Sequence, residues 1–442
     1  MEQTQSHDVI IIGGGISGTA LLYLLAKYTD IKDIMLFEKY ASIATVNSHG
    51  RNNSQTLHCG DIETNYTLEK ALEVQSTANM VLRYALTLKN KDKVIYKYSK
   101  MVLGVGDKEV AQLRERFIQF SPHYKNMRLL ERDEIEKVEP SLIKGRKESV
   151  VALAVLDDYT AVNFQALSES FVEHANEVQD KNIQIKLNTK VLKISKSERG
   201  YTVKTKDGTH HAKFVVVSSG GHSLLFAHRM GYGLEYSCLP MAGSFYYTPK
   251  VLNGKVYTVQ NDKLPFAAIH GDPDVLVPNK TRIGPTALAL PLLERYNLKT
   301  FIEFLQVFKP DINVVKALWG LLKVSDIRNY LFKNILFEVP IIRRRLFLKD
   351  ARKIVPELQL KDLTFADKTG GIRPVMIDKK KHCLHLGEAK LNPGNGLIFN
   401  MTPSPGATSC LGNAEKDLDI IIEYLGAKAD KERLNSDLKK EE

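Results

Sequence analysis

The sequence of 442 residues predicts an α/β fold, in which a discontinuous Rossmann-type dinucleotide-binding domain is joined to a mixed-sheet α+β domain. Three observations near the N-terminus support this prediction. An apolar strand at 8–12 runs into three glycines, residues 16–28 are typical of a helix, and a second apolar strand follows at 33–37. A strand, a glycine turn, a helix and a second strand in this order form one βαβ unit.

The rest of the chain alternates helices with short strands. Residues 41–65 are polar and irregular, and a long helix is predicted over 67–89. The segment 214–223 is a strand that runs into a second glycine turn, whereas 236–300 alternate short strands with Gly and Pro, and 298–357 are mostly helical. Shorter helices are predicted at 107–119, 131–138, 164–178 and 413–426, and strands at 93–96, 101–105, 150–156, 183–188, 191–195, 201–205 and 265–269.

These elements divide into two predicted domains. The nucleotide-binding domain takes 1–65, 145–235 and 365–430, and the substrate-binding domain takes 66–144 and 236–364. The second domain includes a helical cap that is both basic and apolar. Residues 431–442 are predicted to be a solvated, charged tail.

Composition limits the class of protein. Four cysteines without a C-x-x-C pair suggest neither a metal site nor a disulfide framework, and favour a reducing compartment. A polar start and the lack of a long apolar run predict a cytoplasmic protein without a signal peptide or a membrane-spanning helix. The net charge of +11 suits an anionic partner, which by charge alone is nucleic acid, a membrane surface or an acidic metabolite.

The first glycine turn predicts the class of cofactor. Gly13, Gly15 and Gly18 form G-x-G-x-x-G, which allows a pyrophosphate to approach the backbone at the start of a helix. Glu38 follows Gly18 by twenty residues and ends the second strand. A carboxylate there accepts hydrogen bonds from ribose hydroxyls and repels a 2′-phosphate, which argues against NADP. This unit alone does not separate FAD from NAD.

Later segments favour FAD. The strand before 218–221 ends in small residues, GGIRP covers 370–374, and PSPGATS precedes the last long helix at 403–409. A helix N-terminus there is suited to negative charge on a reduced flavin. The residues predicted to contact the cofactor are Gly13, Gly15, Ile16, Ser17, Gly18, Glu38, Lys39, Asn52, Asn53, Ser54, Gln55, Thr56, Val191, Ser219, Gly220, Gly371, Ile372, Arg373, Pro405, Gly406, Ala407 and Thr408.

With these segments, the chain resembles the FAD-dependent superfamily of D-amino-acid oxidase. The loop SHGRNNSQTLHCGDIETNYT (48–67) resembles the corresponding loop of malate:quinone oxidoreductases and, more distantly, that of L-2-hydroxyglutarate dehydrogenases. The segments 265–274, 282–287 and 394–414 fit the same family, and the resemblance covers about 8–425. One departure is that His270 is followed by Gly-Asp-Pro-Asp, where the family often has Leu-Asp-Thr-Arg.

The resemblance implies that (S)-malate is oxidised to oxaloacetate by hydride transfer to flavin N5, with membrane quinone as the final acceptor. The oxidation needs a base for the hydroxyl proton and cations for the two carboxylates. His270 is the predicted base, because it follows an apolar strand in the substrate domain. Arg373 and Arg282 are predicted to hold the carboxylates. His58 is predicted to orient the flavin or to line the substrate pocket.

Two interpretations of the basic, apolar segment 313–353 stay open. Its spacing favours a helical cap whose apolar face is core, whereas the resemblance implies peripheral attachment to the inner face of the cytoplasmic membrane. Arg343, Arg344 and Arg345 would then contact anionic lipid. Two alternative functions remain: an L-2-hydroxyglutarate dehydrogenase or oxidase, and a flavin-binding, RNA-associated protein. Nucleic acid is not the expected partner, because no recognition module is present.

Overall fold

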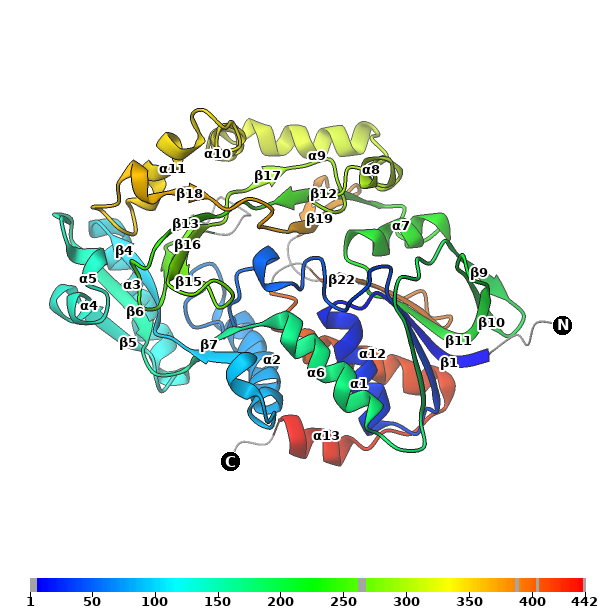
Figure 1. The fold of residues 1–442 in the computed structure, drawn as a ribbon. Coiled ribbons are helices and arrows are strands. Elements are labelled where there is room, and N and C mark those ends of the chain that lie inside the picture. The colour runs from blue at the N-terminus through cyan, green and yellow to red at the C-terminus, as the bar shows by residue number, and fades with distance from the viewer. Residues whose placement is uncertain (1–5, 261–267, 386–388, 403–404, 440–442) are drawn as a thin grey trace.

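The computed structural model describes residues 6–260, 268–385, 389–402 and 405–439 (Figure 1). Its first sheet has β1 (Ser6–Ile12) at the centre, parallel to β2 (Asp33–Phe37) on one side and to β11 (Thr209–Val217) on the other. The order of its main path is β21-β22-β11-β1-β2-β8, which confirms the predicted Rossmann-type sheet. The other strands are β8 (Asn182–Lys186), β9 (Lys193–Ser197), β10 (Gly200–Lys204), β21 (Ala389–Leu391) and β22 (Leu397–Met401).

The alternation of side chains along β1 explains the two layers that cover this sheet. Val9 and Ile11 pack on one face, while Ile10 and Ile12 pack on the other. The first face is covered by α1 (Ile16–Tyr28), α2 (Leu68–Leu86), α6 (Phe164–Asn176) and α12 (Cys410–Leu425). The second face is covered by the antiparallel pair β9–β10 and by α7 (Gly221–Arg229). Both faces are therefore buried, which explains the nearly continuous apolar runs of these strands.

The second domain is built on a sheet of eight strands. Its order is β18-β13-β16-β15-β14-β4-β6-β5, and a smaller sheet, β17-β12-β19-β20, lies between it and the first domain (Figure 1). The strands are β4 (Lys100–Val105), β5 (Arg128–Glu131), β6 (Val150–Val155), β12 (Tyr236–Ala242), β13 (Tyr246–Pro249), β14 (Lys255–Thr258), β15 (His270–Pro273), β16 (Lys280–Gly284), β17 (Leu288–Ala289), β18 (Thr364–Phe365), β19 (Ile372–Asp378) and β20 (Cys383–His385). A separate pair joins β3 (Ile95–Lys97) to β7 (Tyr159–Val162).

Helices cover this domain on two sides. The helices α3 (Asp107–Phe120), α4 (Arg132–Val138) and α5 (Pro140–Ile143) lie at one end of the large sheet. The helical cap, residues 300–351, lies along the upper edge in Figure 1. It consists of α8 (Thr300–Phe308), α9 (Ile312–Lys323), α10 (Ser325–Leu336) and α11 (Arg343–Ala351). None of the helices in the described ranges is long and apolar enough to cross a membrane.

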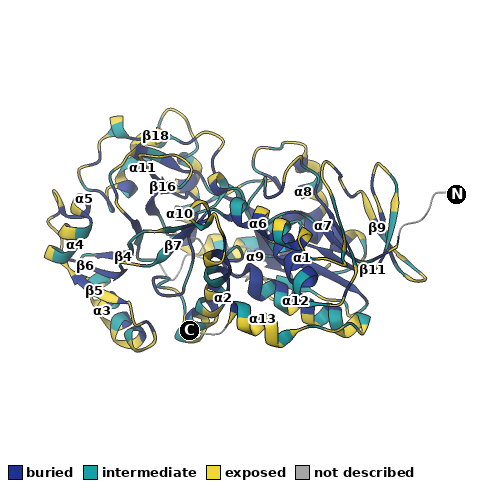
Figure 2. Cartoon of the chain, turned by 60° about the horizontal axis from the view of Figure 1, so that its bottom comes forward, coloured by how far each residue is buried: buried dark blue, intermediate teal, exposed yellow. Residues whose placement is uncertain are grey.

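Several predicted domain assignments differ from the structure. Helix α2 falls in the predicted substrate-binding segment 66–144, but it packs against the first sheet. Residues 150–155 form β6, which pairs with β4 and β5 in the second sheet and not in the nucleotide-binding domain. The predicted tail forms α13 (Lys431–Leu438), which lies beside α2 (Figure 2). It folds because Leu434 and Leu438 are buried against the first core. The strand predicted over 265–269 falls largely outside the described residues.

Candidate functional site

One cavity extends from the first glycine turn to the small sheet of the second domain. Its walls come from segments far apart in the sequence, which only the fold brings together. They include parts of 12–17, 37–58, 189–191, 218–229, 241–245, 285–303, 371–375 and 402–408. Because one end is the start of α1 and the other contains residues of both domains, the shape suits an elongated dinucleotide.

The glycine turn is built as the sequence predicted. Gly13 has a φ of +114°, and a Cβ atom at Gly18 would lie 2.0 Å from the carbonyl oxygen of Gly13. The turn therefore excludes side chains at both positions. The helix α1 starts at Gly15 without a side-chain cap, and the N–H of Ile16 donates to Oγ of Ser48 at 3.0 Å. Such a helix start leaves backbone N–H groups for phosphate oxygens.

Glu38 holds the turn from the end of β2. Its carboxylate accepts the backbone N–H of Gly14 at 2.8 Å and that of Tyr40 at 2.9 Å. Burial raises the pKa of Glu38, although these two hydrogen bonds oppose the shift. Glu38 also lines the cavity, which fits its predicted position beside a ribose.

Most of the predicted cofactor residues line this cavity, and two do not. Gly18 packs behind the turn, where it lets α1 approach β1. Gln55 is fully buried, with its Nε2 donating to Oδ1 of Asp274 at 3.0 Å and to the carbonyl of Gly50 at 3.1 Å. Gln55 therefore supports the loop and does not face the cavity. The cavity-lining members are Gly13, Gly15, Ile16, Ser17, Glu38, Lys39, Asn52, Asn53, Ser54, Thr56, Val191, Ser219, Gly220, Gly371, Ile372, Arg373, Pro405, Gly406, Ala407 and Thr408.

The nucleotide end of the cavity contains two acids that sequence reasoning missed. Glu294 forms an ion pair with Lys39, and Tyr40 donates to it. Glu303 on α8 accepts from Lys190 at 2.7 Å and contacts Nε2 of His222 at 2.9 Å. The hydrogen bond from His222, with that from Lys190, lowers the pKa of Glu303 to about 2. No motif marks these acids, since Glu294 precedes α8, Glu303 lies on it, and only the fold brings both to the cavity.

Arg373 is the cation at the opposite end. It lies near the start of β19, and its side chain lines the cavity. Across the described ranges, no carboxylate lies within ion-pair distance of its guanidinium, and the titratable groups that act on its charge are the hydroxyls of Tyr330, Tyr257 and Tyr66. Burial lowers the pKa of Arg373. A guanidinium enclosed without a counter-ion is costly, so this end of the cavity is suited to an anion.

His58 lines the cavity too, and the structure gives it a carboxylate partner. Its Nδ1 lies 2.6 Å from Oε1 of Glu63, and its backbone N–H donates to Oγ1 of Thr408 at 3.1 Å. The edge of its ring faces Tyr257, with centroids 6.5 Å apart. A histidine paired with a carboxylate at a cavity wall has the arrangement of a general base.

His270 and Arg282 lie elsewhere. Neither is among the described residues that line the cavity. His270 is fully buried and stacks on Tyr257, and burial holds its pKa well below the ordinary value. Arg282 is paired with Asp272 at 3.3 Å and Asp274 at 3.8 Å, and donates to the carbonyl of Gly50 at 3.2 Å. The predicted role of Arg282 in carboxylate binding therefore does not fit, because its charge is already neutralised.

The fold and the cavity define the class of protein, in which a Rossmann-type domain is joined to a second domain with a mixed sheet, as in FAD-dependent oxidoreductases. Among solved structures, the dithionite-reduced L-α-glycerophosphate oxidase of Mycoplasma pneumoniae, with FAD bound, superposes with a TM-score of 0.64. It is 20% identical to this chain, and the match covers 96% of each chain. This similarity confirms the predicted fold class.

Sequence comparisons identify the family. The family model described as malate:quinone oxidoreductase matches residues 5–284. A probable malate:quinone oxidoreductase of Campylobacter jejuni is 47% identical over 98% of this chain and 99% of its own length. The malate:quinone oxidoreductase of Helicobacter pylori strain 26695 is 46% identical over 99% of both chains. The chain belongs to the malate:quinone oxidoreductase family.

Proposed function

We propose that this protein oxidises malate to oxaloacetate at the Arg373 end of the cavity and passes the electrons to membrane quinone. The observation that carries the proposal is that one cavity is lined both by an arginine without a carboxylate partner among the described residues and by a histidine that is paired with a carboxylate. The glycine turn, Glu38 and the backbone around Gly371 would hold FAD along the cavity. When bound, FAD supplies the two-electron acceptor. The side chains supply the binding, the orientation and the proton transfer.

Arg373 would bind one malate carboxylate. A planar guanidinium offers two parallel N–H donors, so it fixes the direction of the acid as well as its place. A Cβ atom at Gly371 would lie 2.6 Å from the carbonyl oxygen of Asn52. The glycine therefore lets the start of β19 pass close to the loop that carries His58. We therefore propose that the cation of Arg373 and the candidate base His58 act on the same substrate molecule, since both line the cavity.

His58 is the base that the geometry favours over His270. A base must reach the hydroxyl proton, and His58 lines the cavity whereas His270 is enclosed behind it. His58 would take the C2 hydroxyl proton while the C–O bond becomes a carbonyl. His270 supports Tyr257, whose hydroxyl is 2.6 Å from Oγ1 of Thr56 at the cavity wall.

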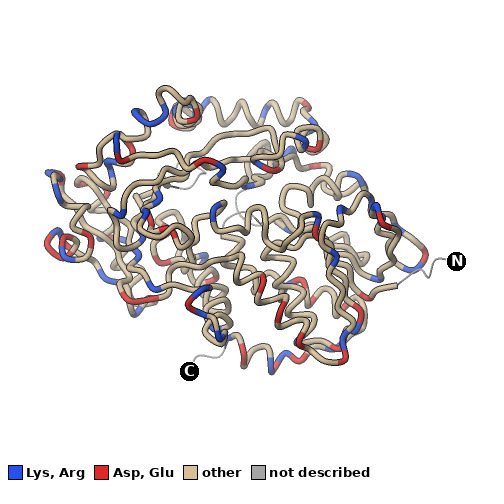
Figure 3. The backbone as a smooth tube through the Cα atoms, in the orientation of Figure 1, with Lys and Arg blue, Asp and Glu red and all other residues tan. Residues whose placement is uncertain are grey.

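The outer face of the helical cap supports peripheral membrane contact. On α9, Trp319 is 60% exposed, and Lys316 and Lys323 are exposed near it. Figure 3 shows the cap as uncharged stretches interrupted by Lys and Arg positions and by some Asp and Glu positions. The large apolar side chains exposed on the cap and just before it are Leu298, Phe301, Ile302, Leu305, Ile312, Val315, Trp319, Leu322, Val324, Phe332, Ile335, Val339 and Ile341.

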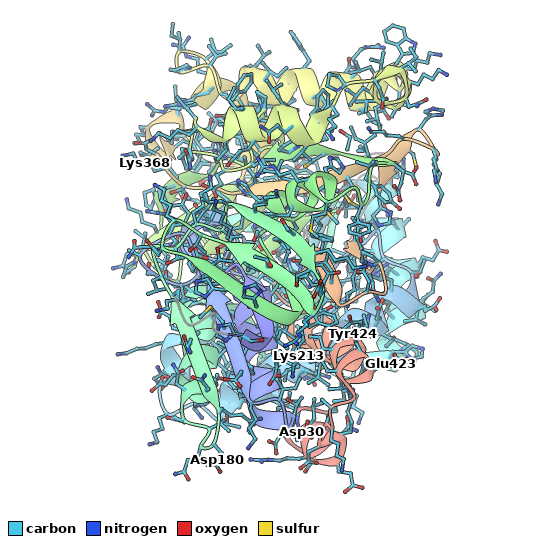
Figure 4. The ribbon with its side chains drawn as sticks, turned by 90° about the vertical axis from the view of Figure 1, so that its right-hand side faces the viewer. Asp30, Asp180, Lys213, Lys368, Glu423 and Tyr424 are labelled. Atoms are coloured by element: carbon cyan, nitrogen blue, oxygen red, sulfur yellow. The ribbon has the colours of Figure 1, made fainter. Side chains whose placement is uncertain are left out.

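An apolar face with interleaved cations suits the headgroup region of an anionic bilayer. The cap forms one end of the molecule, and Asp30 and Asp180 lie at the other end (Figure 4). We therefore propose attachment to the inner face of the cytoplasmic membrane, where quinone is dissolved. Of the predicted lipid-contacting arginines, Arg343 stacks on Phe365 and Arg344 donates to the carbonyl of Leu360. The apolar face, more than this cluster, would make the contact.

Binding of a dicarboxylate that cannot be oxidised tests the location of the substrate. Malonate added to the FAD-loaded protein is expected to perturb the visible flavin spectrum saturably. The perturbation is expected to disappear in Arg373→Met and to persist in Arg114→Met, where an exposed arginine on α3 is replaced. Equal malonate binding in both variants would place the anion site elsewhere.

A further inference from the structure

Glu63 is an acid with a largely buried side chain, and neither malate binding by Arg373 nor proton transfer to His58 involves it directly. It lies five residues after His58 in the loop that joins the first βαβ unit to α2, and its side chain is 12% exposed. Its Oε1 is 2.6 Å from Nδ1 of His58. Burial alone would raise its pKa, but the hydrogen bond and charge of His58, together with Lys100, hold the pKa of Glu63 below its ordinary value.

This contact decides which ring nitrogen of His58 carries the hydrogen. An ionised carboxylate can only accept, so Nδ1 must be the donor. In the neutral imidazole, Nε2 is then unprotonated and has a free lone pair. Among the described residues, the hydrogen bonds of His58 are the contact of Nδ1 with Glu63 and the bond from its backbone N–H to Thr408, and neither involves Nε2. The pair thus presents a proton acceptor rather than a proton donor to the cavity.

The surroundings fix Glu63 in place. Arg116 on α3 donates to the backbone carbonyl of Glu63 at 2.6 Å and to that of Tyr66 at 3.2 Å. Two residues before Glu63, Asp61 pairs with the buried Lys100 of β4 at 2.8 Å. The titratable and charged groups around the His58–Glu63 pair are Cys59, Asp61, Lys100, Arg116, Tyr124, Tyr257 and His270.

We propose that Glu63 is a positioning residue that locks His58 in the Nδ1–H tautomer, so that Nε2 accepts the hydroxyl proton of the 2-hydroxy acid. This inference rests on the proposed function and adds to it the reason why His58 can act as the base. In the step, the substrate O–H bond breaks and an N–H bond forms at Nε2. The imidazolium then has a full negative charge beside it, which stabilises the protonated product of the transfer.

Two substitutions separate charge from hydrogen bonding. Glu63→Gln keeps an acceptor oxygen but removes the negative charge, whereas Glu63→Ala removes both. Flavin reduction by L-malate is expected to slow by about tenfold in Glu63→Gln and by about a hundredfold in Glu63→Ala. The acid limb of the pH–rate profile is expected to move to lower pH in Glu63→Gln, because the imidazolium loses its counter-charge. An unchanged profile in Glu63→Gln would overturn the proposal.

A double variant tests whether Glu63 acts on the rate through His58 or only through the stability of the fold. If Glu63 acts through His58, Glu63→Gln is expected to cost nothing further in the His58→Ala background. Additive losses would contradict the proposal and would indicate a structural role.

Nitrogen-15 NMR reports the tautomer of His58 without any catalytic turnover. The sample is the FAD-loaded protein with labelled histidine, and the variant His58→Gln assigns the signal. A protonated Nδ1 in the wild type that becomes mixed in Glu63→Ala supports the proposal, even if malate fails as substrate. Mixed tautomers in the wild type refute it.

Discussion

Tyr257 stacks on His270 with ring centroids 4.5 Å apart and an interplanar angle of 21°. The stack encloses an imidazole whose sequence position suggested a catalytic base. Its Nδ1 lies 3.4 Å from the carbonyl oxygen of Ala268, and its Nε2 lies 3.4 Å from Oδ1 of Asp272. The contacts are those of a packed core histidine.

The two histidines are therefore expected to respond differently to substitution. His58→Ala is expected to lower the rate of flavin reduction by about two orders of magnitude with little change in melting temperature. His270→Ala is expected to lower the melting temperature by several degrees, because it leaves a void under Tyr257, and to reduce the rate by less than about tenfold. Stopped-flow reduction and thermal unfolding of both variants check this. If only His270→Ala lowered the rate of flavin reduction by two orders of magnitude, His270 would be the catalytic base, as the sequence predicted.

Substitution of Arg373 is expected to weaken malate binding. Arg373→Met removes the cation at the substrate end and is expected to raise the KM for malate by about thirtyfold or more, or about 2 kcal/mol. Arg373→Lys keeps the charge but loses the two-pronged geometry, so an intermediate effect is expected. Steady-state kinetics over a range of malate concentrations measures both. Arg114→Met serves as the control on the far side of the second domain, and an unaltered KM in Arg373→Met would remove Arg373 from the substrate site.

The lowered pKa of Glu303 predicts that the stability of the folded protein depends on pH. Its pKa is lowered from 4.5 to about 2 in the folded protein, so its contribution is fully present above pH 4.5 and is lost as the pH falls towards 2. After allowance for solvent screening, Glu303→Gln is expected to cost about 1 to 2 kcal/mol at neutral pH. The difference from wild type is expected to shrink below pH 4.5. Urea unfolding at several pH values tests this, with exposed Glu136→Gln on α4 as the control. A constant difference at every pH would contradict the assignment.

The apolar face of the cap predicts a membrane phenotype. The double variant Trp319→Ser, Phe332→Ser is expected to lower co-sedimentation with vesicles of anionic phospholipid several-fold. The control is Ile118→Ser, which replaces a residue 74% exposed on α3, outside the cap. Reduction of the flavin by malate in solution is expected to be unchanged. Equal sedimentation of both proteins would show that the exposed cap residues do not contact lipid.

The local signals in the sequence were sufficient for the nucleotide-binding unit. The alternation of β1, the glycine turn and Glu38 lie within one short stretch, so spacing alone fixes their relation. The apolar run of β6 was placed in the wrong sheet, because a buried strand looks the same in any sheet. The last helix was missed because Leu434 and Leu438 are the only apolar residues in it.

The site was predicted only where its residues belong to a motif. Arg373 adjoins two glycines and lines the cavity, and its role there stays a prediction. The neutralisation of Arg282 depends on Asp272 and Asp274, which only the fold brings to it. Glu63 carried no signal beyond its nearness to His58, since five residues of irregular loop do not show that two side chains meet. Glu303 belongs to α8 of the cap and Glu294 to the segment that precedes this helix, and only the fold brings both to the cavity.

Anaerobic titration of the FAD-loaded protein with L-malate tests the central claim most directly. If the protein is a malate:quinone oxidoreductase, stoichiometric L-malate is expected to bleach the visible flavin absorbance, whereas D-malate is not. A soluble quinone analogue is expected to restore the colour faster than oxygen. Parallel titrations with L-2-hydroxyglutarate and L-lactate set the selectivity. Bleaching by L-2-hydroxyglutarate but not by L-malate, or no bleaching by any 2-hydroxy acid, would contradict the proposed oxidation of malate.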